Sequence, residues 1–212
     1  MINEPVDVLI VGAGASGAAI AYSLSSLGVK ILCLEQGQWV NHNNFTSTKK
    51  DYEFYRYSDF SCDPNVRKLP EDYPINSDES PITPVNFNAV GGSTINYLAH
   101  WPRFHPSDFR TKSLDGVADD WPIEYETLAP FYDLNSTIMG VSGLAGNPSY
   151  PYYEPTLPPI TLGKLGKTLA KGFNKLGWHW WPSDTTILSE DCLLYTSPSP
   201  RDGLLSRKPS SA

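Results

Sequence analysis

Three glycines near the start of the chain have the spacing of a phosphate-binding turn. Gly12, Gly14 and Gly17 form the pattern G-x-G-x-x-G in the stretch "GAGASG". In this pattern the first glycine allows a tight turn, the second lets backbone amides approach a pyrophosphate, and the third lets a helix pack closely on a strand. The helix would begin at Ala15 and Ser16, where its positive end attracts phosphate. The spacing therefore predicts a dinucleotide site.

An acidic residue follows where such a site needs one. Glu35 comes 18 residues after Gly17, at the position of a carboxylate that accepts hydrogen bonds from an adenosine ribose. A carboxylate also repels a 2′-phosphate, so NADP is disfavoured. A glycine-rich turn without a ligand is the weaker alternative, and these four residues leave FAD and NAD both open.

A second glycine pair lies in the stretch "VGGSTINYLAHW". Gly91 and Gly92 lack β-carbons, and Ser93, Thr94 and Asn96 add short polar groups beside them. FAD extends past its pyrophosphate into a ribityl chain and an isoalloxazine ring, and so needs more close backbone than NAD does. The pair therefore favours FAD, although "GGST" alone is also typical of an ordinary turn.

The elements around the first glycines predict a Rossmann-like α/β fold. The apolar run 6–11 is typical of a strand buried on both faces of a parallel sheet. A helix is expected over 15–27, with Gly28 as its stop, and a second strand over 29–34. Strand, helix and strand form a βαβ unit.

The rest of the chain is predicted to be less regular. Prolines and tyrosines make 38–88 an irregular covering segment, and 151–160 reads as a proline-rich linker. Short helices are expected within 105–133, with starts near Ser107 and Glu124.

An amphipathic helix is expected over 162–176. Its apolar stripe comprises Leu162, Leu165, Leu169, Phe173 and Leu176, and its basic stripe comprises Lys164, Lys167, Lys171 and Lys175. The basic stripe is compatible with an anionic lipid surface, but we favour a solvated face.

Composition excludes several classes of protein. With 16 basic and 23 acidic residues the net charge is −7, which disfavours a nucleic-acid partner. The three cysteines lack metal-ligand spacing, so no metal site is expected. No apolar run is long enough for a membrane span and no signal peptide is visible, so a cytoplasmic location is expected.

These segments resemble the N-terminal part of the glucose-methanol-choline (GMC) oxidoreductases. The resemblance rests on "DVLIVGAGASGAAIAYSLSSLGVKILCLEQG" and "VGGSTINYLAHWPRFHPSDF", continues through "DDWPIEYETLAPFYD", "GVSGLAG" and "GWHWWPS", and covers about Val6 to Asp184. Its later segments are similar to the bacterial branch that includes gluconate and polyol dehydrogenases. It assigns the first three glycines to the FAD pyrophosphate, Glu35 to the ribose, and Gly91 to Tyr97 to the pyrophosphate and flavin.

The resemblance implies an FAD-dependent oxidoreductase that acts on the CH–OH group of a small alcohol, polyol or sugar, with an unspecified electron acceptor. The family takes its catalytic histidine from near its C-terminus, far beyond the matched segments, so no residue here is assigned as catalytic. His100 is expected to be a packed histidine. We therefore expect the chain to be an N-terminal part of such an enzyme that is inactive alone. The alternatives are an NAD-dependent dehydrogenase and a non-catalytic truncated product.

Two further expectations follow from the resemblance. Some family members attach FAD through a histidine that aligns approximately with Asn96, so FAD is expected to be bound non-covalently here. Many members carry asparagine where this chain has Tyr97, which alters the polar contact near the flavin. Residues 1–191 are expected to be a partial FAD-binding domain. Residues 192–212 are expected to be a non-family tail, either disordered or an artefact, since they resemble a translated sequencing-adapter read-through.

Overall fold

The protein is represented by a computed structural model that describes residues 5–41, 61–70, 72 and 75–190. These residues belong to two compact units, one ending at Tyr97 and the other beginning at Leu98, and each is described by itself. The expected tail, 192–212, lies outside the described residues.

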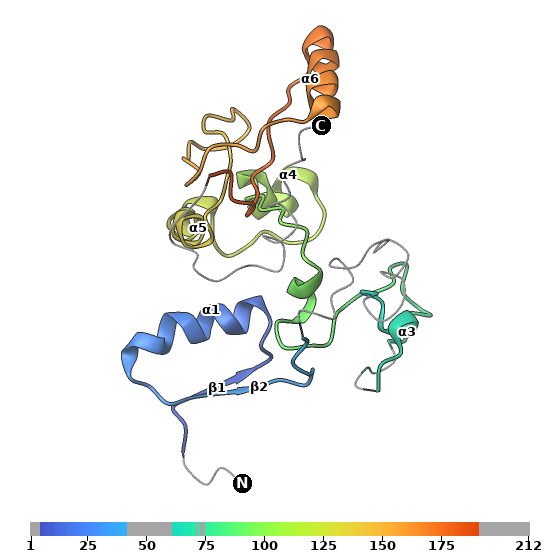
Figure 1. Ribbon diagram of the computed structural model, residues 1–212, viewed down its shortest axis with the longest axis vertical. Helices are drawn as coiled ribbons and strands as arrows, with labels where there is room; N and C mark the ends of the chain where they lie inside the picture. Colours follow the sequence, from blue (N-terminus) through green and yellow to red (C-terminus); the bar gives the residue numbers. More distant parts are fainter. Residues whose placement is uncertain (1–4, 42–60, 71, 73–74, 191–212) are drawn as a thin grey trace, which may run out of the picture. The chain divides into compact units, whose positions relative to one another are not determined.

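The first unit contains the predicted βαβ arrangement. Strand β1 (Val8–Val11) leads into helix α1 (Ala15–Leu24), which tightens into a 3₁₀ turn, η1 (Ser25–Leu27), before strand β2 (Ile31–Leu34). The two strands pair in parallel, and α1 runs alongside them (Figure 1). Gly28 ends the helical stretch at φ 69°, a left-handed conformation that glycine adopts without strain. The α/β, Rossmann-like fold class is confirmed.

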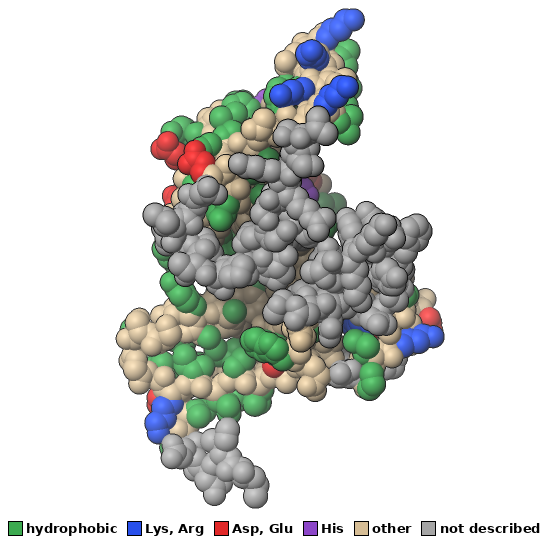
Figure 2. Space-filling model, viewed as in Figure 1, with side chains coloured by type: hydrophobic (Ala, Val, Ile, Leu, Met, Phe, Trp, Pro, Cys, Tyr) green, Lys and Arg blue, Asp and Glu red, His purple; other side chains and the backbone are tan. Residues whose placement is uncertain are grey.

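The sheet is covered less completely than the sequence suggests. Ile10 is 6% exposed, whereas Leu9 is 55% and Val11 81% exposed. The prediction of a strand buried on both faces is therefore wrong for this chain. Within the described residues the sheet has two strands, so one helix buries one face and leaves apolar side chains at the surface (Figure 2).

The segment after β2 is irregular in its described parts, as predicted. Helix α3 (Pro64–Arg67) is its one described helical turn, and Gln38 forms an isolated bridge with Ala89. Arg67 is buried, pairs with Asp72, and lies over the Phe87 ring at 4.5 Å. Residues 42–60 lie outside the described residues.

Helices dominate the first part of the second unit. They are the 3₁₀ helix η5 (Pro106–Arg110), α4 (Thr111–Asp115) and α5 (Tyr125–Met139). Glu124 precedes α5, as predicted, at its N-cap. The start predicted near Ser107 is wrong by two residues, because His105 is the N-cap, and its backbone N–H donates to the Asp108 carboxylate at 2.7 Å.

Residues 151–160 have no regular structure, but they pack instead of acting as a free linker. Leu157 bridges the fully buried Ser142, which also bridges Thr185. The Tyr153 hydroxyl donates to Asp184 at 2.7 Å, and the Arg103 guanidinium lies 3.9 Å from the Tyr153 ring centre. These contacts give the second unit a partly polar core.

Helix α6 (Lys164–Leu176) follows this segment at the predicted place, and Gly177 ends it at φ 69°. No helix among the described residues is long and apolar enough to cross a membrane.

Candidate functional site

The first glycine turn lies directly after β1. Gly12 has φ 95°, in the left-handed region that favours glycine, and its N–H donates to the Leu34 carbonyl at 2.7 Å. A β-carbon at Gly17 would lie 2.1 Å from the Gly12 carbonyl oxygen and 3.1 Å from Ile10. The fold itself therefore requires both glycines, in the roles that the motif predicts.

Neither the backbone conformation nor a contact within the protein requires glycine at Gly14. Its φ of −73° and ψ of −171° suit any residue, and no heavy atom lies within 4 Å of an added β-carbon. Gly14 is the N-cap of α1, so the first N–H groups of the helix, at Ala15, Ser16 and Gly17, have no partner within the helix. Open space therefore adjoins backbone donors and the positive end of the helix dipole, a combination that fits a phosphate group.

Glu35 directly follows β2 and stabilises the same turn through hydrogen bonds. Its carboxylate accepts hydrogen bonds from the N–H of Ala13 at 2.6 Å and of Gly37 at 2.8 Å. These two bonds, that from Gly37 first, hold the pKa of Glu35 below its ordinary value. A carboxylate has about four acceptor positions, so Glu35 retains capacity for ribose hydroxyls.

The second glycine segment docks onto the first. The N–H of Gly91 donates to the Ala13 carbonyl at 3.0 Å, and a β-carbon on Gly92 would lie 3.6 Å from the Gly14 Cα. Gly91 and Gly92 have φ values of 98° and 60°, so both adopt the left-handed region. They open the 3₁₀ helix η4 (Gly92–Asn96) beside the N-terminus of α1.

Gly37 allows this approach and was missed from the sequence. A β-carbon on Gly37 would lie 2.3 Å from both the Cα and the nitrogen of Ala89, and the Val90 N–H donates to the Gln38 carbonyl at 3.1 Å. The chain leaving β2 therefore positions the residues just before Gly91. A glycine two residues beyond Glu35 was the available signal.

The polar side chains of the second segment divide into two kinds. Ser93 Oγ accepts from the Phe87 N–H at 3.1 Å, and Thr94 Oγ1 donates to the Gly91 carbonyl, so both hydroxyls hold the turn itself. The Asn96 Nδ2 is buried and has no hydrogen-bond partner. The N–H of Tyr97 closes η4 by donating to the Thr94 carbonyl at 3.2 Å.

A buried amide N–H without a hydrogen-bond partner destabilises the protein, and a hydrogen-bond acceptor on a ligand would remove this cost. The bare space at Gly14, the helix end and the Asn96 donor all belong to the first unit. Ala15, Ser16 and the carboxylate of Glu35 lie at the same carboxyl end of the strands, where open α/β sheets bind ligands. The residues present thus fit a dinucleotide.

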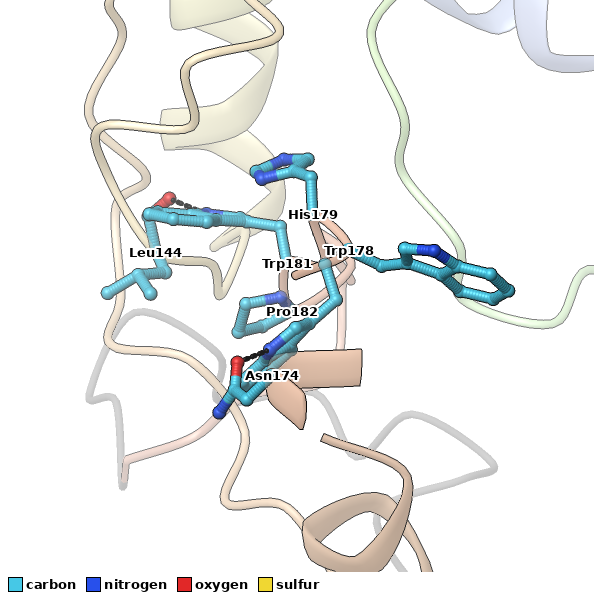
Figure 3. Close-up of a pocket in the computed structure, with 7 residues that line it drawn as sticks. Leu144, Asn174, Trp178, His179, Trp181 and Pro182 are labelled. Carbon is cyan, nitrogen blue, oxygen red and sulfur yellow. Dashed lines mark hydrogen bonds between the residues drawn. The ribbon is translucent and has the colours of Figure 1, made fainter. Parts of the chain in front are cut away.

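The second unit carries an aromatic hollow of about 350 Å³, shown in Figure 3. It is lined by Leu144, Asn174, Trp178, His179, Trp180, Trp181 and Pro182. The indole N–H groups of Trp180 and Trp181 donate to Asn174 Oδ1 and the Leu144 carbonyl, both at 2.8 Å. Trp178 is 61% exposed.

The described histidines show no geometry of a catalytic base. His100 is exposed, so the expectation of a packed histidine is wrong; its backbone pairs with Thr185. His105 stacks on Tyr150 with ring centres 4.0 Å apart. His179 Nε2 lies 3.0 Å from Asn147 Oδ1.

Comparison with known proteins agrees with the fold of the first unit. A family model described as an NAD(P)-binding Rossmann-like domain matches residues 10–69. This match includes the first glycine turn and Glu35 and ends before Gly91.

Several of the curated relatives are dehydrogenases or oxidases. A 2-methyl-1,2-propanediol dehydrogenase of Mycolicibacterium austroafricanum is 45% identical over 190 residues, covering 88% of this chain and 34% of that protein. The fructose dehydrogenase large subunit of Gluconobacter japonicus is 29% identical, covering 86% and 37%. The paromamine 6′-oxidase of Streptomyces fradiae is 25% identical, covering 85% and 31%. The chain thus spans about a third of the length of these relatives.

Proposed function

We propose that this chain is the dinucleotide-binding part of an FAD-dependent oxidoreductase of the glucose-methanol-choline family. In this proposal residues 1–191 belong to the FAD-binding part, and 192–212 do not. The observation that carries it is the hydrogen bond from Gly91 to Ala13, which sets a second stretch of bare backbone beside the first.

FAD is favoured over NAD by what lies beyond the pyrophosphate turn. The family model described as NAD(P)-binding ends at residue 69, within a turn geometry that both cofactors share. The second segment, 91–97, lies outside that match and adds the buried amide of Asn96. A ribityl chain and an isoalloxazine ring offer acceptors for such a donor, and they extend the ligand past the first turn.

Each site residue would contact a different part of FAD or hold the turn beside it. The N–H groups of Ala15, Ser16 and Gly17 would bind the pyrophosphate, and Glu35 the adenosine ribose. The backbone of Gly91 and Gly92 would adjoin the pyrophosphate, while Ser93 and Thr94 hold the turn. Asn96 and Tyr97 would lie toward the flavin. With Asn96 at the position of the family's attachment histidine, FAD would be held by non-covalent contacts alone.

The substrate class rests on the relatives. Their names include a propanediol dehydrogenase and a fructose dehydrogenase, both of which act on hydroxyl-bearing molecules. Bound FAD supplies a ring that accepts a hydride from the alcohol carbon. The hydroxyl proton needs a base, which we place outside this chain because the family resemblance takes its catalytic histidine from near the C-terminus.

A test of this function is retention of flavin by the full chain. The purified protein is mixed with FAD or with NAD, passed through a gel-filtration column, and its absorbance spectrum is recorded. We expect flavin absorbance to elute with the protein and NAD to be lost. Retention of NAD without FAD would instead support an NAD-dependent dehydrogenase, and retention of neither would support a non-catalytic product.

A further inference from the structure

Helix α6 exposes the leucines that the amphipathic pattern would place against a core. Leu165 is 73%, Leu169 51% and Leu176 61% exposed, whereas Ala170 is the buried residue of the helix. At about 100° per residue, the three leucines project within an arc of about 40°. They form one apolar stripe along the surface, which we call the leucine stripe.

Every charged side chain of α6 is a lysine. Lys164, Lys167, Lys171 and Lys175 are all exposed and project within an arc of about 80° on the side away from the leucine stripe. The sequence contains no aspartate or glutamate from Pro155 to Ser183. Figure 2 shows these lysines gathered over α6. A chain with a net charge of −7 therefore carries a concentrated positive patch on this one helix.

We propose that α6 lies flat on an anionic lipid surface, with the leucine stripe in the acyl boundary and the lysines at the headgroups. A solvated helix accounts for exposed lysines but not for an exposed leucine stripe. A basic amphipathic helix with leucine and aromatic side chains on its apolar side has the composition of interfacial membrane helices. This mode of binding needs no membrane-spanning helix.

Neighbouring residues support the same orientation. Trp178 follows the helix after Gly177, is 61% exposed, and stacks on Phe173 with ring centres 6.1 Å apart. Indole rings suit the membrane interface because one end is apolar and the other polar.

The experiment is flotation of the full chain with lipid vesicles. Vesicles of phosphatidylcholine alone are compared with vesicles in which a fraction of the lipid is phosphatidylglycerol. We expect the chain to float with the anionic vesicles and not with the neutral ones, and to be released by high salt. Each lysine near an anionic surface contributes about fivefold to affinity, so reversing two of them (Lys167→Glu with Lys171→Glu) should reduce binding at least 25-fold, taken as about fivefold squared.

Matched variants separate the helix from general surface effects. Leu169→Glu should abolish flotation, whereas Leu114→Glu in α4, a leucine that is 63% exposed, should leave it unchanged. Circular dichroism would establish that both variants remain folded. Binding that does not depend on lipid charge, or that Leu169→Glu leaves intact, would overturn the proposal. So would a dimer that Leu169→Glu dissociates in the absence of vesicle binding, since the leucine stripe would then face a second copy of the chain.

Discussion

The backbone N–H of Gly91 donates a hydrogen bond to the carbonyl of Ala13 at 3.0 Å. Ala13 lies between the first two glycines of the phosphate-binding turn, and its own N–H is held by Glu35. One residue of the first turn thus connects to both the carboxylate after β2 and the second glycine segment. Substitutions at Ala13, at Glu35 or in the second glycine segment are therefore expected to affect the same ligand site.

Two glycines of the first turn should respond differently to valine. Gly14→Val should abolish FAD binding at a cost of about 1 kcal/mol in stability, because a branched side chain enters the open space at the helix end. Gly17→Val should unfold the first unit, because its β-carbon would overlap the Gly12 carbonyl. FAD titration and circular dichroism measure the two effects. Unchanged FAD affinity in a folded Gly14→Val protein would refute the phosphate assignment.

Asn96→Leu should stabilise the ligand-free protein but weaken its binding of FAD. Removing a buried, unpartnered amide should raise the free energy of unfolding of the ligand-free chain by about 1 kcal/mol. The same change should weaken FAD binding about threefold to tenfold by deleting one hydrogen bond. Urea unfolding without ligand and FAD titration give the two values. If both properties fall together, Asn96 is a structural residue and not a ligand donor.

Glu35→Ala should show a stability loss that depends on pH. The pKa of Glu35 is lowered in the folded chain, so its contribution is present above the ordinary carboxyl value and is lost as pH falls through the folded value. The difference in unfolding free energy between wild type and variant should therefore be larger at about pH 7 than at about pH 3. Glu79→Ala, at an exposed position, is the matched control. A difference that does not change with pH would contradict the two backbone hydrogen bonds.

Arg103 should be the more costly member of its ion pair in the second unit. Its side chain is 3% exposed, against 61% for Asp133, and it also lies over Tyr153 near the buried Asp184. Arg103→Ala should cost about 2 to 3 kcal/mol, because it removes a buried side chain that pairs with Asp133 and packs on the Tyr153 ring. Asp133→Ala should cost about 1 kcal/mol or less. Equal losses in urea unfolding would show that the exposed pair, and not the buried environment, determines the stability.

The flavin should be released by denaturation. An amide nitrogen such as that of Asn96 is delocalised into its carbonyl and is not a nucleophile, unlike a histidine nitrogen. Acid precipitation of the FAD-loaded chain should therefore leave the yellow colour in the supernatant. Colour that remains with the precipitate would show that another side chain forms a covalent bond.

The βαβ unit could be predicted because its signals are local. The spacing of Gly12, Gly14 and Gly17 and the apolar runs on either side depend on a few neighbouring residues, and each appears where the pattern places it. The exposure of Leu9 and Val11 could not be predicted, because it depends on how many strands flank β1 and not on the composition of β1.

The candidate site was predictable only in part. That Gly91 and Gly92 adjoin a ligand followed from the length of FAD and from the family resemblance, and that expectation is still to be tested. The role of Gly37 depends on a tertiary contact with Ala89, which no local pattern encodes. The roles of Ser93 and Thr94 in holding their own turn likewise needed the three-dimensional arrangement.

The central claim is that two glycine segments bind one long cofactor, and the affinities of the full chain for FAD and ADP test it most directly. ADP contains the adenosine and the two phosphates but none of the ribityl chain or flavin that 91–97 would contact. We predict that calorimetric titration will give a dissociation constant for FAD at least about tenfold lower than that for ADP, as one or two added hydrogen bonds would produce. Equal affinities would show that the second segment contacts no part of the cofactor, and would contradict the proposal.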